Sequence, residues 1–143
     1  MAAYCAQADI LEYLTDEQLA QLADLDDDGT ADAAVVSRAC ADASRQIDGY
    51  ISPRYTVPCT GTAPDLLKVL ATRWAVYLLQ LARQSVTEDA RRQHEEDVKF
   101  LERVGEGKAS LGDPVNAPEG DAAPGVNLSA DDRQFTRTKM SGW

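Results

Sequence analysis

The stretch LLKVLATRWAVYLLQLA, residues 66–82, decides the fold. Its apolar side chains fall on nearly every side of a 3.6-residue period, and such a helix is normally buried among others. Pro64 suits the first turn of this helix because its missing N–H costs nothing there. Asp65 then places negative charge at the positive end of the helix dipole. The sequence therefore predicts a central helix over 64–82.

Upstream of this segment, the chain predicts two more helices and a short apolar patch at 8–14. Thr15 and Gln18 have the spacing of a capping box, in which each side chain bonds the backbone of the other. A helix is therefore expected to begin after Thr15. Apolar residues at three- and four-residue spacing predict a longer helix over 33–51, and Pro53 prevents it from continuing far.

Downstream of the central segment, one further helix is predicted. Thr87 is its expected N-cap, with acids in the first turn, and Gly105 and Gly107 end it. His94 lies on the apolar face of this helix, which favours a structural role over a catalytic one. No segment alternates like a strand. The predicted fold class is therefore all-α, a small bundle of four to five helices with an extended C-terminal tail.

The composition indicates one acidic domain. The 143 residues carry a formal charge of −10, and 44% are hydrophobic, too many for full disorder. That charge argues against a protein that wraps nucleic acid with basic side chains, and no apolar run is long enough for a membrane helix. We expect Cys5, Cys40 and Cys59 to be buried free thiols, the alternative being one disulfide and one unpaired cysteine. No catalytic constellation accompanies His94, so no enzyme is predicted.

The last third of the chain differs from the rest in composition. Proline and glycine are frequent there and apolar residues sparse, which divides the chain into a helical domain over 1–108 and an extended tail over 109–143. The final residues are basic and carry large apolar side chains that could fill pockets on a partner. The alternative is an end without function. The predicted partner-binding residues are Arg133, Phe135, Arg137, Lys139, Met140 and Trp143.

The acidic stretch 24–32 opens like a calcium-binding loop. Alternate aspartates around a glycine turn can supply the oxygens that Ca²⁺ requires, but Val35 stands where the bidentate glutamate is expected. The alternative is a turn that caps the next helix, with Asp32 as its N-cap. The candidate ligands are the carboxylates of Asp24, Asp26, Asp28 and Asp32.

Taken in order, these features resemble the Mu-like phage head–tail joining (adaptor, or connector) proteins. No single motif is specific, and the resemblance depends on their order and spacing over nearly the whole chain. It is carried by the segments 9–11, 16–22, 24–29, 34–58, 64–70, 75–77, 107–112 and 133–137.

The resemblance implies a virion structural protein of the bacteriophage neck, made in the host cytoplasm. Such adaptors form a ring, typically of twelve copies, that docks on the portal, extends the DNA channel and supports the next neck (stopper) protein. Duplex DNA would pass through without sequence-specific binding, no membrane would be involved and no cofactor would be required. An acidic channel lining would repel phosphate. The first alternative function is a small calcium-binding helical module. A second alternative is an unrelated helical interaction domain.

Overall fold

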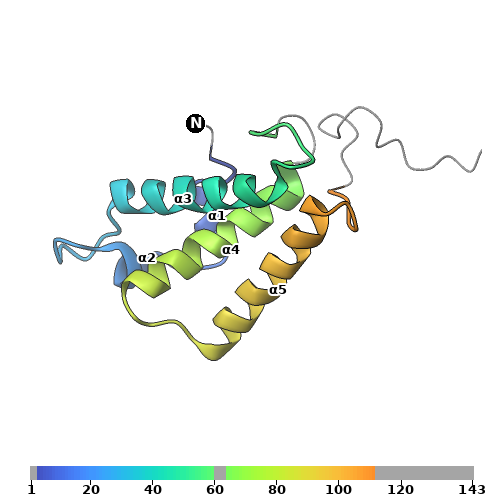
Figure 1. The fold of residues 1–143 in the computed structure, drawn as a ribbon. Helices are drawn as coiled ribbons and strands as arrows, with labels where there is room; N and C mark the ends of the chain where they lie inside the picture. The colour runs from blue at the N-terminus through green and yellow to red at the C-terminus, as the bar shows by residue number, and fades with distance from the viewer. Residues whose placement is uncertain (1–2, 60–63, 112–143) are drawn as a thin grey trace, which may run out of the picture.

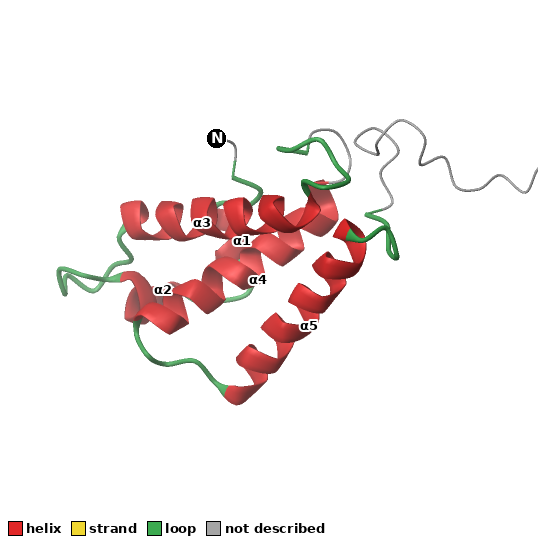
Figure 2. Cartoon of the chain, viewed as in Figure 1, coloured by secondary structure: helices red, strands yellow, loops and turns green. Residues whose placement is uncertain are grey.

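A computed structural model describes residues 3–59 and 64–111 of the chain. Within these ranges the secondary structure is helical and contains no strand (Figure 2), which confirms the all-α prediction. None of the helices described is long and apolar enough to cross a membrane. The five helices are α1 (Gln7–Leu11), α2 (Asp16–Ala23), α3 (Ala33–Ile51), α4 (Pro64–Ala82) and α5 (Glu88–Gly105).

Helix α4 is the centre of the bundle, as its sequence predicts, because each of the other four helices contacts it. Helix α3 lies along α4, and α5 packs near the start of α4 and then diverges from it toward Glu88 (Figure 1). Trp74 is 1% exposed, whereas Leu81 on the outer side is 53% exposed. The α4 residues in the core are Leu67, Leu70, Ala71, Trp74, Ala75 and Leu79.

Two of the three predicted helix caps are confirmed. The Thr15 hydroxyl accepts a hydrogen bond from the N–H of Gln18 (3.2 Å), and the Thr87 hydroxyl accepts one from Ala90 (3.2 Å). Asp32 occupies the N-cap position of α3, as the alternative interpretation of the acidic loop expects, but its side chain makes no capping hydrogen bond. Its carboxylate accepts the N–H of Leu25 instead (2.9 Å), because the acidic loop folds back toward the helix start.

The end of α5 and the residues after it pack against α3 and the loop that follows α3. Leu111, the last residue described, is buried, and its N–H donates to the Tyr55 hydroxyl (3.2 Å). Gly105 lies against the backbone of Tyr50, where a Cβ atom would come 2.5 Å from the carbonyl oxygen. Helix α5 therefore ends at Gly105 as predicted, in close contact with α3.

The N-terminal residues are fixed at the same end of α3. The hydroxyl of Tyr4 donates to Asp48 and accepts the N–H of Cys59 (2.9 Å). Cys5, Cys40 and Cys59 are all buried and none is in a disulfide, which confirms the prediction of free thiols.

Candidate functional site

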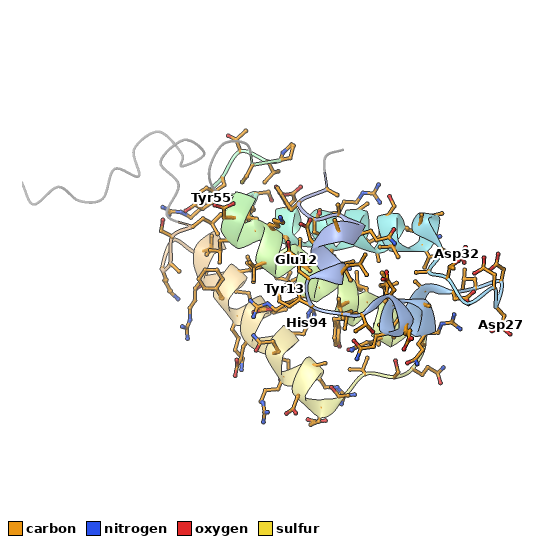
Figure 3. The ribbon with its side chains drawn as sticks, turned by 180° about the vertical axis from the view of Figure 1, so that it is seen from behind. Glu12, Tyr13, Asp27, Asp32, Tyr55 and His94 are labelled. Atoms are coloured by element: carbon orange, nitrogen blue, oxygen red, sulfur yellow. The ribbon has the colours of Figure 1, made fainter. Side chains whose placement is uncertain are left out.

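A cavity of about 210 Å³ with both apolar and ionisable walls lies between α4, α5 and the turn that joins α1 to α2. Tyr13, which is 57% exposed, stands at the rim, and His94 lies close to it in Figure 3. Leu14, Val76 and Ala90 contribute apolar wall. We refer to this space as the α4–α5 cavity.

One side of the α4–α5 cavity is aromatic. The His94 imidazole stacks on the Tyr77 ring with a centroid distance of 4.1 Å and an interplanar angle of 9°, and it lies 4.6 Å from the ring of Trp74. Burial lowers the pKa of His94, and the charges of Asp97 and Glu95 oppose that shift. The half-buried His94 is therefore held toward its neutral form inside an aromatic stack, which is the structural role its position indicates.

The opposite side holds an ion pair that the sequence patterns do not reveal. Asp97 is only 5% exposed, and its Oδ1 forms an ion pair with Arg73 Nη2 (3.2 Å) and accepts a hydrogen bond from Gln93 Nε2 (3.2 Å). A buried carboxylate needs such partners because desolvation would otherwise disfavour its charge. Asp97 does, however, lie three residues after His94 and four before the buried Leu101, so helical spacing is the signal that could have placed it inside.

Polar atoms without a partner gather at this cavity. In the part of the chain that the structure describes, five buried side-chain atoms make no hydrogen bond, and all five belong to residues that line it. Buried polar groups are normally hydrogen-bonded, so five unpaired atoms in the lining of one cavity are unusual. An apolar cavity with unpaired donors and acceptors can bind an amphipathic group. The five atoms are Arg73 Nε, Trp74 Nε1, Gln80 Oε1, His94 Nδ1 and Asp97 Oδ2.

The acidic loop is a second candidate site, and the structure brings three of its four predicted ligands together. Carboxylate oxygens of Asp24, Asp26 and Asp28 lie within 4.8 Å of one another. Asp32 is bonded to the N–H of Leu25. These oxygens are of the type that hard cations prefer. Figure 3 shows the loop projecting at one end of the molecule, near the Asp27 and Asp32 labels.

Backbone donors already occupy part of this loop. The Asp24 carboxylate accepts the N–H groups of Asp27 (2.7 Å), Asp28 (3.3 Å) and Gly29 (2.8 Å). Although desolvation raises the pKa of Asp24, these bonds lower it below its usual value. The neighbouring charge of Asp28, with desolvation and Asp32, raises the pKa of Asp26. A bound cation would relieve the repulsion between Asp26 and Asp28. The three carboxylates therefore suit a cation, although backbone N–H groups already occupy the Asp24 oxygens. Calcium binding stays a prediction.

The predicted partner-binding residues lie outside the described part of the chain. The predicted tail is 109–143, and the structure describes it only to Leu111. Arg133, Phe135, Arg137, Lys139, Met140 and Trp143 therefore stay predictions.

The described part of the chain is all-helical, with a central buried helix and a cavity of mixed apolar and polar walls. Comparison with known proteins identifies its family. The family model described as Bacteriophage Mu, Gp36 matches residues 4–129. Because this match covers most of the chain, the protein belongs to the Mu Gp36 family of phage structural proteins.

Two curated relatives agree with this assignment. The Mu-like prophage FluMu protein gp36 of Haemophilus influenzae is 35% identical over 112 residues, which is 78% of this chain and 77% of the relative. Gene product J of Escherichia phage Mu is 34% identical over 119 residues, covering 81% of this chain and 80% of the relative. The resemblance to Mu-like phage proteins is thereby confirmed, and the protein is a phage virion component.

Proposed function

We propose that this protein is the head–tail adaptor of a Mu-like phage. In this role, copies of the chain form a ring, of twelve subunits, on the portal of the filled capsid. The ring extends the DNA channel and supports the next neck protein. The observation that carries the proposal is the family match over residues 4–129, together with the order of motifs that resembles adaptor proteins. The fold supports it because a compact helical body can stand beside identical copies.

The charge of the body suits a passage for duplex DNA. Residues 3–111 contain 19 acidic and 11 basic residues, a net charge of −8. The first basic residue is Arg38, and nine acids precede it. A surface of one sign repels a polyanion of the same sign, so DNA slides past it and is not held. We place part of the acidic region 9–32 at the channel.

The basic end of the tail suits a contact with the portal or the next neck protein. Phe135, Met140 and Trp143 are the kinds of side chain that fill pockets at interfaces. The three basic residues between 133 and 139 steer the segment toward an acidic partner surface. The segment therefore supplies both the anchors and the charge that such a contact needs.

Complementation in a phage lacking this gene tests the proposal. Loss of the protein should leave DNA-filled heads and free tails that do not join, visible by electron microscopy of the lysate. The full chain should restore joined particles and a ring of density at the portal. The double variant Phe135→Ala/Trp143→Ala should join poorly, whereas Leu128→Ala, in the same tail, should complement fully. Joined, infectious particles in the absence of the protein would overturn the adaptor role.

Calcium binding by the loop 24–32 is the second candidate function. The approach of Asp24, Asp26 and Asp28 to within 4.8 Å favours it. No cofactor is required by the adaptor role, so calcium would act on stability or on contacts made by the loop. Titration of the full chain with Ca²⁺ tests the second function independently, because the adaptor role does not require calcium binding.

A further inference from the structure

The α4–α5 cavity calls for an occupant that is apolar and carries hydrogen-bonding groups. Its walls are largely apolar, yet Arg73 Nε and Trp74 Nε1 are donors without an acceptor, and Asp97 Oδ2 and Gln80 Oε1 are acceptors without a donor. Trp74 and Asp97 are 1% and 5% exposed, so these two groups are closed off from most of the solvent. Leaving buried polar groups unpaired is costly. A peptide segment with an aromatic side chain meets all these requirements because its backbone offers both N–H and C=O.

The chain itself contains a segment of this chemistry. Residues 133–143, RQFTRTKMSGW, combine Phe135 and Trp143 with three basic residues and no acid, a net charge of +3. The body of residues 3–111 carries −8. The segment and the body as a whole therefore carry opposite net charges, which favours their association. At about 210 Å³ the cavity exceeds the roughly 150 Å³ of an apolar cavity known to bind benzene, so a ring-bearing side chain can enter.

The segment can also reach the cavity of its own molecule. The N–H of Ala109 bonds the carbonyl oxygen of Arg103, and the chain stays packed on the bundle as far as the buried Leu111, beside Tyr55. His94 lies nine residues before Arg103 on α5, about 14 Å away along the axis at 1.5 Å per residue. Residues 112–132 supply 21 residues of connector, which can extend to about 70 Å. A tether of this kind gives an effective concentration on the order of millimolar, far above that of a second molecule in dilute solution.

We propose that the α4–α5 cavity binds the basic aromatic segment 133–143 of the same chain. An aromatic side chain of the segment enters beside the His94–Tyr77 stack. The cavity is then an intramolecular docking site for the tail. The inference goes beyond the adaptor role because it concerns the free protein, in which these side chains occupy their own cavity before they contact the proposed neck partner.

The two tryptophans provide a direct readout in the full-length protein. Trp74 and Trp143 are the only two in the chain, so an ¹⁵N-labelled sample gives two indole N–H signals. The double variant Phe135→Ala/Trp143→Ala should shift the Trp74 signal, and an unlabelled peptide of residues 133–143 should restore its position. The matched control Val126→Ala/Leu128→Ala removes apolar side chains from the connector and should leave the signal unchanged.

A variant of the cavity gives an independent arm. Ala90→Phe fills part of the wall from the first turn of α5, and truncation of the two aromatic residues should then no longer move the Trp74 signal. Cross-peaks between the Trp74 indole and protons of Phe135 or Trp143 should be seen in the natural chain and should persist on dilution. An unchanged Trp74 signal in the tail variant, with no response to millimolar peptide, would overturn the proposal. A shift that grows with protein concentration would overturn the intramolecular assignment.

Discussion

Two glycines in helices test how closely α3 and α5 pack. Gly105 ends α5, and an added Cβ atom there would lie 2.5 Å from the backbone oxygen of Tyr50 in α3. Gly49 lies within α3 and is exposed, and an added Cβ atom would meet nothing within 4 Å. The same substitution, glycine to alanine, should therefore have opposite effects at the two positions.

The magnitudes follow from helix propensity and from the contact. Alanine in place of Gly49 should stabilise the protein by about 0.5–1 kcal/mol because alanine loses less backbone entropy in a helix. At Gly105, any such gain is smaller than the cost of separating two helix backbones, because real Cβ contacts are essentially never below 3.0 Å. Overpacking typically costs about 1–3 kcal/mol. We therefore expect Gly105→Ala to be destabilised by about 1–2 kcal/mol.

Thermal and urea unfolding of the full chain measure both effects. The two variants should differ in melting temperature by on the order of 10 °C, with the natural protein between them. Gly49→Ala is the matched control because it makes the same chemical change without the contact. Equal stabilisation by both substitutions would refute the close approach of α3 and α5.

Three further predictions concern the loop, the cavity and a helix cap. Adding Ca²⁺ should raise the melting temperature by several degrees in the natural protein and not in Asp24→Ala, and no response of the natural protein would count against calcium binding. Because burial lowers the pKa of His94, the unfolded chain takes up a proton near pH 6.5 before the folded protein does, so stability should fall as the pH decreases through that value. His94→Phe should flatten this dependence in urea unfolding between about pH 5 and 7, and an unchanged slope would assign it to another group. Thr15→Ala should cost about 1 kcal/mol in the same assay because the N–H of Gln18 loses its acceptor, and a neutral effect would contradict the cap.

The helices could be predicted because their signals are local. Thr15 and Thr87 begin helices within a few residues of their capping partners, and the apolar run 66–82 indicates burial without reference to the rest of the chain. Helix bounds and the central position of α4 follow from such patterns. The closing glycine of α5 could likewise be placed from its sequence position.

The cavity could not be predicted in the same way. Asp97 stands in the charged run Glu95-Glu96-Asp97, which is typical of a solvent-exposed surface, and its partner Arg73 lies on another helix 24 residues earlier. Helical spacing from His94 and Leu101 could place Asp97 on the inner face of α5, but only the crossing of α4 and α5 brings it to Arg73. The hydrogen bond of Asp32 could not be predicted locally either. Its carboxylate accepts the N–H of Leu25, seven residues earlier, because the loop folds back toward the start of α3.

The stretch between Asp48 and Cys59 ties down both ends of the bundle, since Tyr4 bonds its first and last residues and Leu111 bonds Tyr55 within it. A stretching force applied through the two chain ends would therefore load this short stretch first. The helix-to-helix contacts would carry little of the tension until those hydrogen bonds broke. Such an arrangement separates tension on the chain from the packing that keeps the helices together.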